Sequence, residues 1–237
     1  MALYYQQPIN GAYSIPGAAL VAAALPNFSF AEMVGAFLMA GLIVLVIGMS
    51  GLVRKLADSI PFPIVMAMIA GALIRFGIDI IDSAIAAPAI VGAALVGYVV
   101  LSRFLPRVPG VLGALALGVL VAAILGDFGT LEGGIGLSTP VLVMPAFDLG
   151  AMLAVAVPLA LLVIGAENAQ AMGVLMAERY DPPFNVMTII SGIGGLLAPI
   201  FGGHNANIAG PMTAICSSDQ AGQDPRCRYV APIVNGV

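Results

Sequence analysis

Long runs of apolar residues, separated by short polar stretches, dominate this chain of 237 residues. A helix needs about 17 to 25 apolar residues to cross a bilayer, and several of these runs are that long. The pattern predicts eight spans and the start of a ninth: Pro8–Leu25, Phe30–Gly51, Pro63–Phe76, Ala84–Leu105, Val108–Gly126, Leu149–Ala177, Val186–Pro199, Pro199–Ser218 and Tyr229–Val237. The predicted fold class is an all-α integral membrane protein.

The span Pro199–Ser218 contains polar and helix-breaking residues at membrane depth. Glycines and asparagines between Gly202 and Asn207 disfavour regular helix, whereas Ile208–Cys216 is long enough for about two and a half turns. Non-helical backbone persists in a membrane only where protein or a water-filled cavity surrounds it. We therefore predict a broken span whose short helix, with Asn205 as its N-cap, directs unpaired N–H groups toward an anion.

A second stretch, near the start of the chain, has the same order of features. PINGAYSIPGAAL (Pro8–Leu20) and PIFGGHNANIAGP (Pro199–Pro211) both begin with Pro-Ile-x-Gly, which we expect to be extended. A ring residue follows, Tyr13 or His204, then an N-cap candidate and a short helix of small residues. Paired interrupted segments of this kind indicate the binding site of a secondary transporter. The candidate substrate-binding residues on the two spans are Tyr13, Ser14, Gly17, His204, Asn205, Asn207 and Ile208.

Glu167 is an ionisable residue at the end of the unbroken apolar run Leu149–Ala166. Twelve residues, about 18 Å of helix, separate it from Arg179, so we place it near the bilayer midplane. Intramembrane carboxyls are costly and mark proton or substrate pathways, although a protonated carboxyl that only bonds a neighbouring helix is the alternative. The neighbouring Asn168 is a substrate ligand or an interhelical hydrogen-bond partner, and the same two roles are open for Gln170.

Other polar and small residues in these spans also have two interpretations. His204 either titrates or stabilises strained backbone through one hydrogen bond. Tyr13 either stacks on an aromatic substrate or fills a helix interface. The glycines at positions 192, 194 and 195 predict a close-packing surface between helices rather than a site.

Charge gives the class and the orientation. Only 8% of the residues are charged, against about 25% in ordinary soluble chains, which excludes a water-soluble globule. If the spans alternate, all Lys and Arg residues except Arg75 fall on one face, which is therefore cytoplasmic. Those residues are Arg54, Lys55, Arg103, Arg107, Arg179, Arg226 and Arg228.

Nothing in the sequence indicates a nucleic-acid surface, a metal site or a cofactor, and Cys216 and Cys227 are expected to be free thiols.

The chain divides at its longest connector, which is acidic and rich in glycine. Residues 1–126 form part of a first repeat with five spans, the first of them broken; residues 127–148 form an external connector. Residues 149–237 form part of a second repeat with three spans, the last of them broken, followed by a truncated span. The two broken spans then run in opposite directions, as an inverted-topology repeat requires.

The two broken-span motifs, the stretch Ser29–Gly77 and the downstream DPRCRYVAPIVNGV resemble the benzoate/proton symporter (BenE-like) family, which is similar in architecture to nucleobase and sulfate transporters. The resemblance implies fourteen spans in two inverted sevens, of which this chain begins at the third and stops as the eleventh begins. It implies a multi-pass protein of the inner (plasma) membrane that binds substrate between two facing half-helices. A homodimer is compatible with it.

The resulting hypothesis is a proton-coupled symporter of a small aromatic carboxylate such as benzoate. Glu167 carries the proton, and the substrate's negative end lies between the N-termini of the short helices near Ser14–Gly17 and Asn205–Ala209. A glutamate at 167 is more similar to the nucleobase branch, so a uracil- or xanthine-like permease is the alternative, with Glu167 and Asn168 bonding the ring. A non-transporting membrane fragment is a further alternative, and an enzyme is not expected, because the sequence shows no nucleophile–base pair.

Overall fold

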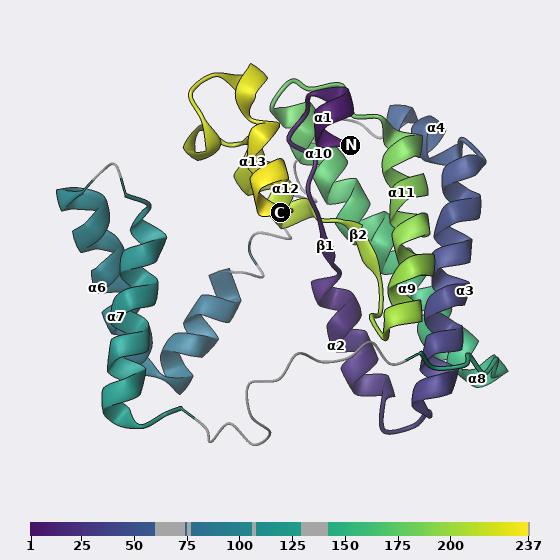
Figure 1. Ribbon diagram of the computed structural model, residues 1–237, viewed down its shortest axis with the longest axis horizontal. Coiled ribbons are helices and arrows are strands. Elements are labelled where there is room, and N and C mark those ends of the chain that lie inside the picture. Colours follow the sequence, from purple (N-terminus) through teal and green to yellow (C-terminus); the bar gives the residue numbers. More distant parts are fainter. Residues whose placement is uncertain (60–73, 75–76, 106–107, 129–141, 237) are drawn as a thin grey trace. The chain divides into compact units, whose positions relative to one another are not determined.

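A computed structural model describes residues 1–59, 74, 77–105, 108–128 and 142–236 (Figure 1). These residues belong to two compact units, Gly71–Ser138 and the larger unit formed by Met1–Ala70 with Thr139–Val237. The predicted span Pro63–Phe76, apart from Ile74, lies outside the described residues, as do residues 129–141 of the predicted connector.

The smaller unit is built around two helices, α6 (Pro88–Phe104) and α7 (Gly110–Leu125), which pack against each other. Their glycines permit the contact: a Cβ atom at Gly97 would lie 2.7 Å from the carbonyl carbon of Gly113. Residues 77–86 are also helical. Large apolar side chains on α6 and α7 are exposed within the described residues, as expected of helices that face lipid or other helices.

The larger unit contains most of the elements. Its N-terminal part comprises α1 (Ala2–Tyr5), β1 (Gly11–Tyr13), α2 (Ile15–Ala24), α3 (Phe30–Met49) and α4 (Leu52–Ser59). Its C-terminal part comprises α8 (Leu149–Ala151), η1 (Met152–Ala156), α9 (Val157–Leu162), η2 (Val163–Asn168), α10 (Ala169–Ala177), α11 (Phe184–Leu197), η3 (Ala198–Phe201), β2 (Ala206–Ile208), α12 (Gly210–Ser217), η4 (Asp219–Ala221), η5 (Pro225–Cys227) and α13 (Val230–Asn235).

Three helices among the described residues are long and apolar enough to span a membrane: Phe30–Met49, Leu149–Ala177 and Phe184–Phe201. The first begins with a capping box, in which Ser29 and Glu32 satisfy each other's backbone N–H groups. The mostly helical, apolar architecture confirms the predicted class of all-α membrane protein.

Helix α11 packs closely along α3, and its glycines are responsible. A Cβ atom at Gly192 would lie 2.5 Å from the backbone nitrogen of Leu45, and one at Gly41 would lie 2.5 Å from the carbonyl carbon of Gly195. The opposite side of α11 carries β2, where Gly194 faces Ala206. The prediction that the glycine cluster is a packing surface is confirmed.

The span Leu149–Ala177 is continuous but irregular. Two of its segments, η1 and η2, are π-helical, and the second ends with Glu167 and Asn168. The sequence pattern gave no sign of these wide turns, since their residues are as apolar as a regular helix requires. Such segments occur frequently at functional sites, because they reorient the side chains on one helix face.

The two broken spans meet in an antiparallel two-stranded ribbon. Gly11 lies opposite Ile208, Ala12 opposite Asn207, and Tyr13 opposite Ala206. Each strand leads within two residues into a short helix, α2 or α12, which we call the half-helices. They leave the ribbon in opposite directions (Figure 1).

Two predictions about the second broken span are wrong. Its half-helix begins at Gly210 with Ala209 as the N-cap, so Asn205 does not cap it. The Pro-Ile-x-Gly lead is also not extended there, because Ala198–Phe201 forms a 3₁₀ turn that ends at Gly202, whose φ is +79°. Residues 206–208 pair as strand β2, so the helix can begin only after them. Pro211, in the first turn, favours a helix start at Gly210.

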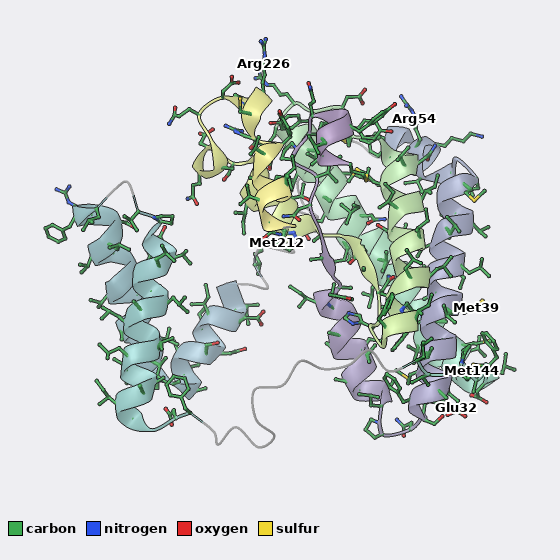
Figure 2. All side chains as sticks on the ribbon, viewed as in Figure 1. Glu32, Met39, Arg54, Met144, Met212 and Arg226 are labelled. Carbon is green, nitrogen blue, oxygen red and sulfur yellow. The ribbon has the colours of Figure 1, made fainter. Side chains whose placement is uncertain are left out.

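The ends of the larger unit differ in character. Figure 2 shows Arg54 and Arg226 at one end of this unit, and Glu32 and Met144 at the other.

Between the ends, buried apolar residues from α2, α3, η1 and α9 form one core cluster, which includes Phe37, Val155 and Leu159. A second cluster joins Ile9 and Ile208 of the ribbon region to Ala171 and Leu175 of α10.

Candidate functional site

A buried carboxyl lies where the two half-helices begin. Glu167 is 5% exposed, and its Oε1 atom accepts a hydrogen bond from the hydroxyl of Ser14 at 3.3 Å. The backbone groups of Ile15 and Gly210 also lie close enough to interact with this carboxyl. Ile15 is the first residue of α2 and Gly210 the first of α12, so this carboxyl lies near both helix N-termini. Helix N-termini carry unpaired N–H groups and a partial positive charge, which favour an anion.

Ser14 connects the two broken spans through its side chain and its backbone. Its hydroxyl oxygen accepts from the N–H of Gly17 at 3.0 Å, which confirms the predicted N-cap of α2. Its own N–H donates to the carbonyl oxygen of Asn205 at 3.3 Å. Nε2 of His204 lies 2.9 Å from the carbonyl oxygen of Ser14 and donates to it, because a carbonyl only accepts.

Tyr13 and His204 form a ring pair next to Ser14, which follows Tyr13 in the chain and accepts from His204. Their ring centroids lie 5.5 Å apart with an interplanar angle of 36°. Tyr13 is 55% exposed within the described residues, so part of its ring remains free of protein contact. Tyr13 and His204 hold corresponding positions in the two broken-span motifs, and in the fold their rings are direct neighbours.

Asn168 is held by a residue that the sequence analysis did not single out. Its Oδ1 atom accepts from the hydroxyl of Ser191 at 2.9 Å, and that hydroxyl accepts from the N–H of Ile208 at 3.0 Å. Ser191 therefore connects the π-helical segment η2 to strand β2. An isolated serine on the apolar helix α11 was the available sequence signal, because buried hydroxyls need partners.

The remaining predicted residues line or support the ribbon. Asn205 and Asn207 are buried, and their side-chain amides have no hydrogen-bond partner among the described residues. The Ile208 side chain packs in the second core cluster. Gly17 permits close packing, since a Cβ atom there would lie 2.8 Å from Leu159 Cδ1.

Asn10 was not identified from the sequence, yet it fastens the first broken span to the second half-helix. Its N–H donates to the hydroxyl of Thr213 at 3.3 Å, and its Nδ2 donates to the Cys216 sulfur at 3.5 Å. Its carbonyl oxygen accepts from the N–H of Ala209, the N-cap of α12. Cys216 and Cys227 form no disulfide, as predicted.

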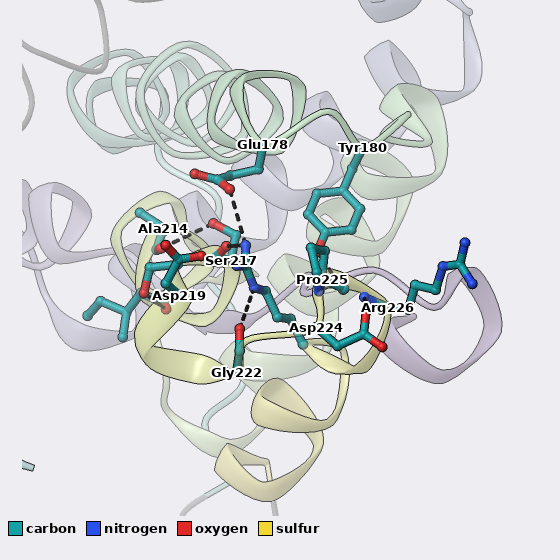
Figure 3. Close-up of polar contacts among 12 residues, drawn as sticks. Glu178, Tyr180, Ala214, Ser217, Asp219, Gly222, Asp224, Pro225 and Arg226 are labelled. Atoms are coloured by element: carbon teal, nitrogen blue, oxygen red, sulfur yellow. Dashed lines mark hydrogen bonds and ion pairs between the residues drawn. The ribbon is translucent and has the colours of Figure 1, made fainter. Parts of the chain in front are cut away.

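The other end of α12 is held by Arg228 (Figure 3). Its buried guanidinium donates to the carbonyl oxygens of Ser217, at 2.5 Å, and Gly222, at 2.9 Å. It also pairs with Glu178, at 3.2 Å, and with Asp219. We call these five residues the Arg228 cluster.

Tyr180 lies beside this cluster and donates its hydroxyl to the carbonyl oxygen of Pro225 at 2.7 Å. Burial raises the pKa of the Tyr180 phenol, and the positive charge of Arg228 opposes that rise. The sequence predicted only that Arg228 lies on the cytoplasmic face.

An apolar helical chain in which two interrupted helices meet over a buried carboxyl is an integral membrane protein of the kind that includes secondary transporters. The chain belongs to the benzoate membrane transport protein (BenE) family, which matches residues 1–237. It is a multi-pass protein of the inner membrane, and its family is a transport family rather than an enzyme family. The resemblance on which the sequence analysis relied is confirmed.

Two curated relatives match the whole chain. The inner membrane protein YdcO of Escherichia coli is 29% identical, and the benzoate membrane transport protein of Acinetobacter baylyi is 28% identical, each over 237 residues. The chain spans 60% of the length of each relative.

Proposed function

We propose that the protein is a proton-coupled symporter of a small aromatic carboxylate such as benzoate. The observation that carries this proposal is the carboxyl of Glu167 at the N-termini of both half-helices. A site whose neutral donors hold the carboxyl of Glu167 is chemically suited to hold the carboxylate of a substrate. The name of the relative from Acinetobacter baylyi, a benzoate membrane transport protein, agrees with this substrate class.

Each part of the site has a role in this proposal. Glu167 carries the proton. The substrate carboxylate binds the donors around Ser14 and Gly210, and the exposed part of the Tyr13 ring contacts the aromatic ring. His204 holds the carbonyl of Ser14 and thereby the N-cap of α2.

We also propose that residues 1–126 and 149–237 belong to two inverted repeats joined by an external connector, 127–148. The antiparallel ribbon and the opposite directions of α2 and α12 support this arrangement. Substrate sites between such repeats are typical of transporters that alternate access around a fixed site.

A nucleobase permease is the second candidate, because Glu167 offers an acceptor to a ring N–H. Burial disfavours it: Asn168, the other residue assigned to the nucleobase, is fully buried, with its Oδ1 atom bonded to Ser191 and its Nδ2 atom without a partner among the described residues. A nucleobase would have to displace the surrounding protein atoms to reach Asn168.

The test is uptake into proteoliposomes that contain the purified protein. An inward proton gradient should drive accumulation of labelled benzoate, and a proton-conducting ionophore should abolish it. Labelled uracil, tested in parallel, should not accumulate. Gradient-driven uracil accumulation without benzoate accumulation would establish the second candidate instead.

A further inference from the structure

We infer that the ionised carboxyl of Glu167 is an internal anion that occupies the binding position of the substrate carboxylate. The substrate then binds by replacing it rather than by binding beside it. The inference rests on the proposed function and specifies the site further, since it states which atoms the two carboxylates share.

The hydrogen bonds of Glu167 carry the inference. The Ser14 hydroxyl donates to its carboxyl, and the backbones of Ile15 and Gly210 lie beside it, all at the beginnings of the two half-helices. These are the donors expected to bind an external anion between α2 and α12. While Glu167 is bonded to them, they are not available to a second carboxylate.

A buried side-chain amide, that of Gln170, packs against the start of the second half-helix. Gln170 packs against the start of α12, where a Cβ atom at Gly210 would lie 2.7 Å from the Gln170 side-chain carbonyl carbon. Gln170 is buried, and its Nε2 atom has no hydrogen-bond partner among the described residues. An unpaired buried donor therefore lies three residues after Glu167 in the same span, and buried donors need a partner.

The ionisable groups on the elements around Glu167 are few and already engaged. His204 donates to the carbonyl of Ser14, Tyr13 packs on His204, and Cys216 accepts from Asn10. Within the described residues, the groups that interact with the Glu167 carboxyl include no cation. Protonation of Glu167 itself is therefore the change that weakens its hold on the donors.

Charge balance follows from this exchange. When Glu167 takes up one proton, its neutral carboxyl leaves the half-helix N-termini and one substrate carboxylate takes its place. The site then holds one negative charge before and after the exchange. Proton and substrate therefore bind together. A proton bound alone leaves the donors without a partner, and a substrate bound alone competes with the ionised Glu167 for them.

A simpler account is electrostatic repulsion between Glu167 and a substrate bound at separate positions. The two accounts differ in what they predict for two neutral variants. Repulsion predicts equal effects for Glu167→Gln and Glu167→Ala, since both remove the charge. Occupancy predicts that Glu167→Ala empties the position fully, whereas the neutral glutamine, like a protonated carboxyl, competes only weakly with a carboxylate because its carbonyl can still accept from Ser14.

The experiment measures acetate binding to purified wild-type protein and both variants by isothermal titration calorimetry. Acetate restores the CH₂–COO⁻ group that Glu167→Ala removes. Acetate should bind Glu167→Ala at least about tenfold more tightly than Glu167→Gln or wild type, roughly the effect of one charge-assisted hydrogen bond. Equal acetate affinity in the two variants would overturn the inference. Glu178→Ala, at the far end of α10, is the control and should behave as wild type.

If Glu167→Ala does not fold, Glu167→Asp makes the same distinction. Its carboxylate keeps the charge but is one methylene shorter, so it cannot reach both half-helices. Occupancy predicts that Glu167→Asp binds benzoate more tightly than wild type at the same pH, whereas repulsion predicts no gain, and no gain would refute occupancy. If acetate binds only Glu167→Ala and wild type takes up no benzoate, the proposed substrate is refuted. The inference that Glu167 and a bound carboxylate share one position would then still hold.

Discussion

The hydroxyl of Ser14 lies 3.3 Å from the carboxyl of Glu167, although 153 residues separate them in the chain. The same hydroxyl oxygen caps α2 by accepting from Gly17. One side chain thus fixes the start of a half-helix and holds the carboxyl that we assign to proton coupling. A change at Ser14 should therefore affect both stability and substrate binding.

Ser14→Ala tests this double role, and Ser29→Ala is its matched control. Ser29 caps α3 through its own capping box with Glu32, away from the site. Both variants should lose about 1 kcal/mol of stability, the usual cost of removing a serine N-cap. Only Ser14→Ala should also weaken benzoate binding, by about tenfold, because it removes a donor to the carboxylate. Equal benzoate affinity in the two variants would refute the role of Ser14 in the site.

The broken spans and their capping serine follow from local chemistry, which is why the sequence predicts them. Glycine and proline interrupt a helix wherever they occur, and Ser14 caps the residues that directly follow it. The start of the second half-helix was misplaced because strand pairing with β1, a contact between distant residues, claims residues 206–208. With that pairing in place, Ala209 precedes the helix and Asn205 remains four residues too early to cap it.

Arg228 should stabilise the protein, whereas its neighbour Arg226 should not. Arg228→Gln removes donors to the carbonyl oxygens of Ser217 and Gly222 and leaves two carboxylates without their partner. We expect a loss of about 2 kcal/mol, in the range for buried acceptors left unpaired. Arg226→Gln, two residues away in the same loop and pointing away from the cluster in Figure 3, should change stability by less than about 0.5 kcal/mol.

Thermal unfolding in detergent measures this difference, with the same buffer and detergent for all proteins. Arg228→Lys serves as a further comparison, because it keeps the charge but lacks the planar fork that reaches several acceptors at once. It should recover only part of the lost stability. Equal melting temperatures for the Arg228→Gln and Arg226→Gln variants would contradict the assigned role of the cluster.

Gly192 should not tolerate a methyl group. In Gly192→Ala the new Cβ atom would lie 2.5 Å from the backbone nitrogen of Leu45 and 2.6 Å from its Cα atom, so α3 and α11 would have to separate. Overpacking of this kind costs about 1 to 3 kcal/mol. Gly165→Ala is the control, since nothing described lies within 4 Å of its new Cβ atom. A melting temperature unchanged by Gly192→Ala would show that the two helices are less tightly packed than described.

The charge bias predicts which end of the larger unit is external. Met144, in the predicted connector, is 86% exposed, and Arg226 lies at the opposite end of the unit (Figure 2). In a background without Cys216 and Cys227, Met144→Cys should react with a membrane-impermeant maleimide added to intact cells. Arg226→Cys should react only after the membrane is opened. Labelling of Arg226→Cys from outside would reverse the topology.

The polar network around Glu167 was only partly predictable. Glu167 itself stands out, because a carboxyl in an apolar run is rare and costly. Ser191 and Asn10 did not stand out, since their importance comes from partners on other elements: Asn168 and Ile208 for Ser191, and Thr213 and Cys216 for Asn10. The π-helical segment that contains Glu167 is as apolar as a regular helix up to that residue, so composition alone does not reveal it.

Glu167→Gln in proteoliposomes tests the central claim most directly, because it mimics the protonated carboxyl permanently. Exchange of benzoate across the membrane should persist, with weaker dependence on pH between about 5 and 8, while accumulation driven by a proton gradient should be lost. Loss of binding as well would favour a nucleobase-type role, in which the carboxylate accepts directly from the substrate. Gradient-driven benzoate accumulation equal to that of wild type would contradict the account and leave Glu167 as a structural carboxyl.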